Sequence, residues 1–194
     1  MRSATSPRPE VLLVLGGARS GKSTFAQEEA RRRGGDNVLY VATAEPCDGE
    51  MRRRIALHRE NRPASWETLE GPPQELASAL WGRRGVILLD CLTVWLSRLF
   101  LALSDAESED EIRWEQEETG ILSAVERLIR SPDSGALLVV VSNEVGWGLV
   151  PPTLLGRRFR DLQGRANQRV GALADHVALV VAGIPLWIKG GPRP

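Results

Sequence analysis

The sequence predicts an α/β fold in which helices cover both faces of a mainly parallel sheet. Near-continuously apolar, β-branched runs recur along the chain, as expected for strands that are covered on both faces. Segments with the helical spacing of apolar residues lie between these runs. The runs span residues 10–15, 37–43, 85–91, 135–144 and 176–183.

The same patterns predict the remaining elements. The segments ASWETLE (64–70) and PLWIK (185–189) are expected to add short strands, the second as an antiparallel edge strand. A length of 194 residues suits one domain, so we expect a single domain over 10–190 between flexible tails at 1–9 and 191–194. Helices are expected over 22–33, 48–62, 93–103, 112–130 and 156–169.

Charge and composition argue against several classes of partner. A net charge of zero gives no electrostatic reason to bind nucleic acid or a membrane surface. No apolar stretch reaches the roughly 20 residues of a membrane span, and the first residues lack the apolar core of a signal peptide. Cys47 and Cys91 have no C-x-x-C spacing, which indicates neither a disulfide framework nor a zinc site. We therefore expect a cytoplasmic protein with reduced thiols.

The stretch LGGARSGKST (15–24) directly follows the first apolar run. Its spacing is Gly16, four residues, Gly21, Lys22 and Ser23, which is the phosphate-binding pattern G-x-x-x-x-G-K-S between a strand and a helix. Glycines let the backbone N–H groups turn inward around phosphate oxygens, and the following helix presents its positive end. The sequence therefore predicts a P-loop NTPase-like domain, in which Lys22 contacts the β and γ phosphates.

A carboxylate at the end of the run VILLD, Asp90, is the candidate partner of this loop. In P-loop proteins such an aspartate lies beside the loop hydroxyl, here Ser23, and helps to hold Mg²⁺ through water. The alternative is a helix cap, because the residues after Asp90 begin a helical pattern.

His58 lies in the predicted helix 48–62, three residues after Ile55 and so on the same side. One interpretation is a half-buried histidine that packs over apolar neighbours. The other is a nucleophile, since a neutral imidazole nitrogen attacks phosphorus and forms a covalent intermediate, and nearby arginines favour the neutral ring and bind phosphate oxygens. His176, at a helix-to-strand junction, is expected to be structural.

The motifs leave three functions open: a transferase that uses His58, another P-loop kinase acting on a small molecule, and a nucleotide-dependent regulatory switch. The base-reading motif N-K-x-D of typical GTPase switches is missing. Asn143 and Glu144 end another apolar run, and ligands bind at the carboxyl ends of strands in open α/β sheets.

Several stretches together resemble the bifunctional adenosylcobinamide kinase / adenosylcobinamide-phosphate guanylyltransferase family of cobalamin biosynthesis, from about residue 10 to 189. They are GGARSGKS, LYVAT, RIALHRENRPASWETLE, LLDCLTVWL, VVSNEVGWGLVP and RRFRDLQGRANQRVGALAD. The resemblance implies a P-loop α/β fold, ATP or GTP and Mg²⁺ as cofactors, adenosylcobinamide and its phosphate as substrates, and a homotrimer. Trp95, Trp147 and Trp187 are candidates for an apolar surface that receives the corrinoid.

The resemblance also implies a set of site residues. His58 matches the histidine that becomes guanylylated, and Asp90 and Glu70 match acidic contacts to the nucleotide. Family members often carry glutamate at the position of Asp90. The matches to the phosphate loop are Gly16, Gly17, Ala18, Arg19, Ser20, Gly21, Lys22 and Ser23, and those to other nucleotide contacts are Val41, Ala42, Thr43, Arg59, Glu60, Asn61 and Arg62.

Overall fold

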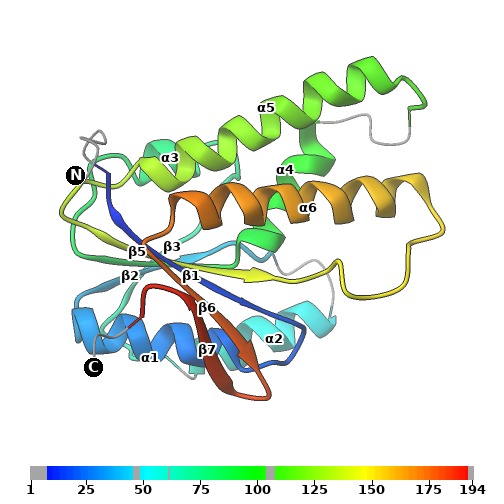
Figure 1. Ribbon diagram of the computed structural model, residues 1–194. Coiled ribbons are helices and arrows are strands. Elements are labelled where there is room, and N and C mark those ends of the chain that lie inside the picture. The colour runs from blue at the N-terminus through cyan, green and yellow to red at the C-terminus, as the bar shows by residue number, and fades with distance from the viewer. Residues whose placement is uncertain (1–7, 46–48, 61, 104–107, 192–194) are drawn as a thin grey trace.

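The computed structural model describes residues 8–45, 49–60, 62–103 and 108–191 (Figure 1). They contain a seven-stranded sheet in the order β3-β2-β4-β5-β1-β6-β7. The strands are β1 (Glu10–Gly16), β2 (Val38–Ala42), β3 (Glu67–Leu69), β4 (Val86–Asp90), β5 (Leu137–Asn143), β6 (His176–Val181) and β7 (Ile184–Lys189). The helices are α1 (Lys22–Gly34), α2 (Gly49–Glu60), α3 (Leu76–Ala79), α4 (Leu92–Leu103), α5 (Glu111–Arg130) and α6 (Leu154–Leu173).

All strands but one run parallel, which confirms the predicted fold class. The exception is β7, which pairs antiparallel with β6 and forms one edge of the sheet, as the segment 185–189 predicted. The predicted short strand in 64–70 is β3, and it forms the other edge. The central strands β1, β4 and β5 are almost entirely buried because helices cover both of their faces.

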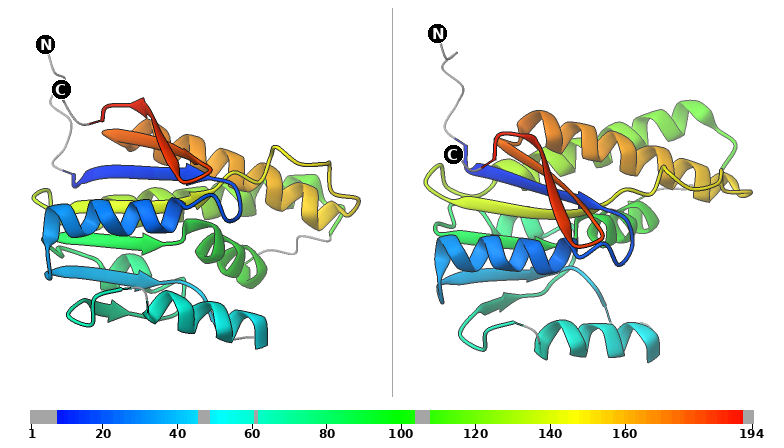
Figure 2. Two further views of the ribbon diagram at one scale, coloured as in Figure 1. Left: turned by 90° about the horizontal axis from the view of Figure 1, so that it is seen from below. Right: turned by 60° about the horizontal axis from the view of Figure 1, so that its bottom comes forward.

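The helices form two layers around the sheet. Helices α3, α4, α5 and α6 lie over one face, and α1 lies over the other, so that a separate apolar cluster fills the space on each side (Figure 1). Helix α2 lies on the α1 side of the molecule but beside the β2–β3 edge (Figure 2). Among the described residues, no helix combines the length and the apolar character needed to cross a membrane.

Two helices differ from the sequence-based expectation. The single turn α3 was not predicted, because it is only four residues long and carries no helical repeat of its own. Helix α6 is longer at both ends than the predicted segment 156–169. It begins after Thr153, whose hydroxyl accepts a hydrogen bond of 3.2 Å from the backbone N–H of Gly156 and so satisfies one free donor of the first turn.

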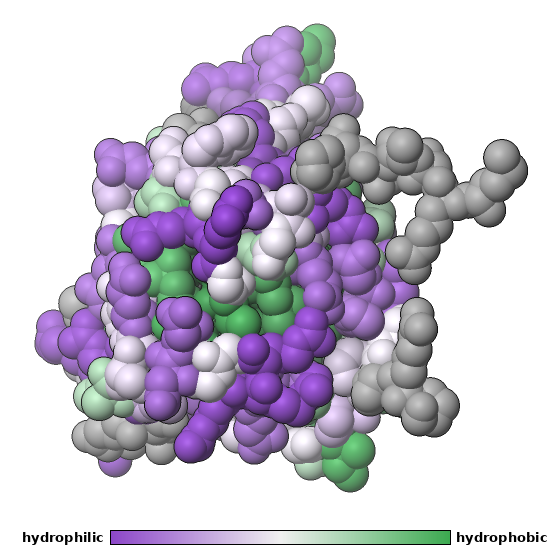
Figure 3. Space-filling model, turned by 90° about the vertical axis from the view of Figure 1, so that its left-hand side faces the viewer, coloured by the Kyte–Doolittle hydropathy of each residue, from purple (hydrophilic) through white to green (hydrophobic). Residues whose placement is uncertain are grey.

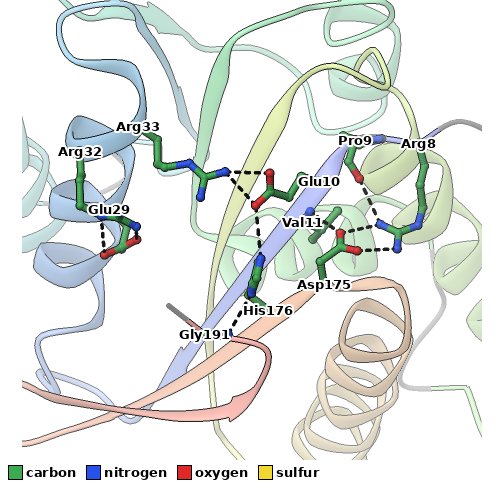
Figure 4. Close-up of polar contacts among 10 residues, drawn as sticks. All are labelled: Arg8, Pro9, Glu10, Val11, Glu29, Arg32, Arg33, Asp175, His176 and Gly191. Carbon is green, nitrogen blue, oxygen red and sulfur yellow. Dashed lines mark hydrogen bonds and ion pairs between the residues drawn. The ribbon is translucent and has the colours of Figure 1, made fainter. Parts of the chain in front are cut away.

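The first described residues are fixed to the start of β6, at the end of the sheet where the strands begin (Figure 4). The guanidinium of Arg8 donates two hydrogen bonds, of 2.8 and 2.9 Å, to the carboxylate of Asp175. The backbone N–H of Val11 donates a third, of 2.9 Å. Figure 3 shows that this end of the molecule carries mostly hydrophilic side chains around a central apolar area.

Replacing Asp175 with asparagine is expected to lower the free energy of unfolding at pH 7 by about 1–2 kcal/mol. Burial alone would raise the pKa of Asp175, but the hydrogen bonds from Arg8 and Val11 outweigh it, and the pKa lies below its usual value. A depressed folded-state pKa gives stability that is present above the unfolded-state value of about 4 and is lost as the pH falls through the folded-state value. The difference between the wild type and the variant should therefore shrink below about pH 4.

Urea unfolding at several pH values measures this difference. The matched control is Asp161→Asn, because Asp161 is exposed on α6 and pairs with its neighbour Arg160. The control should change stability by less than about 0.5 kcal/mol. A stability difference for Asp175→Asn that stays constant from pH 7 to pH 3 would show that the ionised carboxylate is not what stabilises this junction.

Candidate nucleotide site

The phosphate loop connects the end of β1 to the start of α1, as its sequence predicts. Gly21 has the positive φ of 90° that an L side chain rarely adopts, and it ends the loop directly before the helix. Gly16 is confined by the neighbouring strand, because a Cβ there would lie 2.7 Å from the carbonyl oxygen of Val180. The strand, glycine-rich turn and helix N-terminus together form the concave anion site that the motif requires.

Lys22, on the first turn of α1, is only 9 % exposed, and its Nζ donates a hydrogen bond of 3.0 Å to the carbonyl oxygen of Gly17. The ammonium group is therefore held over the loop. Burial lowers the pKa of Lys22, and the nearby Cys91 and Asp90 partly oppose this. Ser20 in the same loop has a buried hydroxyl without a hydrogen-bond partner among the described residues.

A cavity of about 740 Å³ opens beside the loop at the carboxyl ends of the strands. Its wall combines the loop with residues from β2, β4, β5 and α2. The predicted site residues on this wall are Ala18, Arg19, Ser20, Gly21, Lys22, Ser23, Ala42, Arg59, Arg62, Glu70 and Asp90. This volume is in the range of pockets that bind small molecules and cofactors.

Other predicted residues do not line the cavity. Gly16, Gly17, Val41 and Thr43 are not among the described residues that line the cavity. The side chain of Thr43 is buried, and its hydroxyl donates to the carbonyl oxygen of Cys91 at 2.9 Å and accepts from the Cys91 N–H at 2.8 Å. Thr43, directly after β2, therefore ties the end of that strand to Cys91, the wall residue after β4.

Asp90 and Ser23 meet at the cavity wall, as the P-loop pattern predicts. The hydroxyl of Ser23 lies 3.3 Å from Oδ1 of Asp90, and the hydroxyl of Tyr40 donates to Oδ2 at 3.1 Å. Burial and the neighbouring Asp90 raise the pKa of Tyr40, so it remains a protonated donor. One hydroxyl and one carboxylate beside a phosphate site fit Mg²⁺, which takes one or two carboxylates, substrate phosphates and water.

Helix α2 and the segment after it form the opposite side of the cavity. Arg59 pairs with Glu70 at 2.6 Å, and the guanidinium of Arg62 lies 4.3 Å from the centre of the Tyr40 ring. The predicted nucleophile, His58, belongs to α2 by its backbone. The side chains of His58 and Glu60, and all of Asn61, lie outside the part of the chain that the structure describes.

The cavity also contains residues that the site prediction did not include. Asn143 and Glu144 were not among the predicted site residues, although their position at the carboxyl end of a strand, where ligands bind in open α/β sheets, had been noted. Burial and the adjacent Asp90 raise the pKa of the Cys91 thiol to about 11, which keeps it protonated and argues against a cysteine nucleophile. The additional wall residues are Thr24, Tyr40, Ala44, Ile55, Cys91, Val94, Asn143, Glu144 and Val145.

The three tryptophans considered for the corrinoid surface lie in different environments. Trp95 is buried in the core, and its indole N–H donates to the carbonyl oxygen of Pro73 at 2.9 Å, so its proposed role was wrong. Trp187 packs edge-on against Phe25 of α1. Trp147 is 73 % exposed and follows the cavity residues at the end of β5 by only a few positions.

This fold and loop define a P-loop nucleotide-binding protein. The sequence match is more specific: the chain belongs to the family described as cobinamide kinase / cobinamide phosphate guanyltransferase, which matches residues 12–188. The family catalyses a kinase and a nucleotidyltransferase reaction, so the chain is an enzyme that uses nucleotides.

Three curated relatives agree with this assignment. The chain is 41 % identical over 185 residues to the bifunctional adenosylcobalamin biosynthesis protein CobU of Escherichia coli (strain K12), and the match covers 92 % of this chain and 99 % of that protein. It is 42 % identical over 185 residues to CobU of Salmonella typhimurium (strain LT2), with the same coverage. It is 41 % identical over 183 residues to CobP of Pseudomonas aeruginosa (strain PAO1), covering 93 % and 98 % of the two chains.

A solved structure supports the fold independently. An ATPase from the type III secretion system of pathogenic bacteria superposes with a TM-score of 0.54 at 11 % sequence identity. The match covers 89 % of this chain but 51 % of the ATPase, so the chain spans about half of that protein. The likeness concerns the P-loop α/β fold alone.

Proposed function

We propose that this chain phosphorylates adenosylcobinamide with ATP or GTP and then transfers GMP from GTP to the product, through a His58–GMP intermediate. The final product is adenosylcobinamide-GDP. Family membership supports the two activities, and the cavity beside the phosphate loop supports one nucleotide site for both. The observation that carries the proposal is that Lys22, Ser23 and Asp90 converge on this loop while α2, the helix of His58, contributes Ile55 and Arg59 to the opposite wall.

In the kinase step, the hydroxyl oxygen of the acceptor attacks the γ-phosphorus, and the bond from that phosphorus to the β–γ bridging oxygen breaks. The nucleoside diphosphate leaves with the electron pair of that bond. Lys22 neutralises the charge that develops on the leaving diphosphate. Ser23 and Asp90 would hold Mg²⁺, which supplies further charge neutralisation when bound.

In the guanylyl step, an imidazole nitrogen of His58 attacks the α-phosphorus of GTP, and pyrophosphate leaves. A phosphate oxygen of the phosphorylated acceptor then attacks the same phosphorus and displaces the imidazole. Arg59 and Arg62 stand on the α2 side of the cavity, where their guanidinium groups bind phosphate oxygens in this step. The covalent intermediate divides one difficult transfer into two easier ones.

Two further properties belong to the same proposal. The resemblance implies a homotrimer, and the alternating residues Ile184, Leu186 and Ile188 of the edge strand β7 are exposed, which suits a subunit contact.

We place the enzyme in the cytoplasm, where ATP and GTP are supplied. For the corrinoid, the exposed Trp147 is the tryptophan that supports a binding surface near the cavity.

Incubation with GTP labelled at the α or the γ phosphate tests the proposal. Label from the α position should remain on the protein as an acid-labile, base-stable phosphoramidate, and label from the γ position should not. With the acceptor present, the γ label should appear in phosphorylated cobinamide. Phosphorylation of an acceptor without any covalent α label would favour the alternative of a simple P-loop kinase, and tight binding with neither transfer would favour a regulatory switch.

A further inference from the structure

Glu144 lies at the carboxyl end of the sheet, beside the strand that leads into the phosphate loop, and lines the cavity. The strand order places β5 between β4, which ends at Asp90, and β1, which leads into the phosphate loop. Asn143 is in register with Gly16, and the N–H of the next residue, Glu144, donates a hydrogen bond of 3.1 Å to the carbonyl oxygen of Gly16. Glu144 is half-buried and lines the cavity. Its backbone is therefore fixed to the loop that holds the phosphates.

The side chain of Glu144 is held by Asn167 of α6. The Asn167 amide nitrogen donates to Oε1 of Glu144 at 3.2 Å and to the carbonyl oxygen of Asn143 at 3.1 Å. The Asn167 amide oxygen accepts from the hydroxyl of Ser142 at 2.7 Å and from the amide of Gln163 at 2.9 Å. Because two donors fix the oxygen, the nitrogen of Asn167 must face Glu144.

The three hydrogen-bonded side chains Ser142, Gln163 and Asn167 are polar although they are buried between a helix and the sheet. Ser142 and Gln163 are 0 % exposed and Asn167 is 6 % exposed, between α6 and the carboxyl end of β5. Burying amides and hydroxyls at a helix–sheet contact costs free energy that an apolar contact would not. Asn167 connects this group to the carboxylate of Glu144 and to the carbonyl oxygen of Asn143, so it holds the Glu144 side chain in place at the cavity wall.

The other two carboxylates of the described cavity wall have different partners. Asp90 interacts with Ser23 and Tyr40, the positions that suit Mg²⁺. Glu70 pairs with the guanidinium of Arg59. Glu144 receives its hydrogen bond from the amide of Asn167, which orients the carboxylate. A carboxylate held in place within reach of a bound acceptor is positioned to take the proton of its hydroxyl.

We propose that Glu144 is the general base of the kinase step and that Asn167 is its positioning residue. The inference rests on the proposed function. As the acceptor oxygen bonds to the γ-phosphorus, its proton passes to a carboxylate oxygen of Glu144, and the nucleoside diphosphate leaves with the electron pair of the broken bond. The proton then returns to solvent. The guanylyl step needs no such base, because its two nucleophiles are an imidazole and a phosphate oxygen without a proton to lose.

The test is Glu144→Gln, assayed in both half reactions. The kcat for phosphorylation of cobinamide should fall by roughly 10²–10³-fold with little change in KM. Guanylyl transfer to acceptor that is already phosphorylated should stay within about threefold of the wild type. Glu144→Asp should recover part of the kinase activity. The matched control is Glu126→Gln, because Glu126 lies on α5 and pairs with Arg169 outside the cavity; it should leave both reactions unchanged.

A double-mutant cycle tests the positioning role. In the wild-type background, Asn167→Ala should lower the kinase kcat by roughly 10-fold. In the Glu144→Gln background the same substitution should cause no further loss, because Asn167 acts only through the Glu144 carboxylate. If Asn167 had only a structural role, Asn167→Ala would lower the kinase kcat by the same factor in both backgrounds. It would also lower guanylyl transfer as much as the kinase reaction. Equal losses in both half reactions for Glu144→Gln, or an unchanged kinase rate, would overturn the inference. A wild type that forms neither product would instead overturn the proposed function and this inference with it.

Discussion

Replacing His58 with asparagine is expected to lower guanylyl transfer by roughly 10⁴-fold or more, because in the proposed mechanism the His58 imidazole forms the bond to the α-phosphorus. Phosphorylation of cobinamide should stay within about threefold of the wild type, because the acceptor oxygen attacks the γ-phosphorus directly. The two rates are measured separately, with cobinamide and with cobinamide phosphate as acceptor. The thiol of Cys91 does not substitute for the imidazole, since burial keeps its pKa raised to about 11.

The control for this variant is the second histidine of the chain. His176 lies at the start of β6, where its Nδ1 accepts a hydrogen bond of 3.0 Å from the N–H of Gly191 and its Nε2 lies 3.3 Å from Glu10 (Figure 4). His176→Asn should leave both rates unchanged. Equal loss of both rates in His58→Asn, with a protein that still unfolds like the wild type, would contradict the division of roles.

Replacing Lys22 with alanine is expected to lower both rates, each by roughly 10²–10³-fold. Both reactions place new negative charge on a phosphate leaving group, and the ammonium of Lys22 is held directly over the loop that binds it. The loss should appear mainly in kcat, because the charge develops in the transition state and is smaller in the bound nucleotide. Steady-state kcat and KM for the two acceptors, together with the nucleotide dissociation constant, show whether the loss lies in kcat or in binding.

Lys189 provides the matched control, since the chain has only these two lysines. Its Nζ donates to the carbonyl oxygens of Gly171 and Ala172 near the end of α6, far along the chain from the phosphate loop. Lys189→Ala should leave both rates unchanged. If Lys22→Ala removed one activity and spared the other, the two reactions would not share one phosphate site.

The strands of the sheet could be predicted from the sequence because the pattern that marks each strand lies within a single short segment. Runs such as 85–91 and 135–144 are apolar without interruption, and a strand covered on both faces needs that composition. The loop from Gly16 to Ser23 was equally readable, because its chemistry depends on glycines at fixed spacing within one segment. Asp90 was found by combining a strand end with the known partner of that loop, and the structure places it beside Ser23.

The rest of the site depends on contacts between distant segments. Nothing near Thr43 in the sequence shows that its hydroxyl bonds the backbone of Cys91, 48 positions later. The hydrogen bond from Asn167 to Glu144 joins two segments 23 residues apart, and the contact of Arg62 with Tyr40 joins a residue after α2 to a strand. Trp95 was misjudged for the same reason, because its burial is decided by the helices that cover it.

The central claim is that one glycine-rich phosphate loop holds the triphosphate while the imidazole of His58 bonds to its innermost phosphorus. Mass spectrometry of the protein after incubation with GTP and Mg²⁺, followed by peptide mapping at alkaline pH, tests it most directly. The account predicts one added GMP, on the peptide that contains His58, and its loss when cobinamide phosphate is supplied. An adduct on a different residue, or none in a preparation that still forms the guanylylated product, would contradict it.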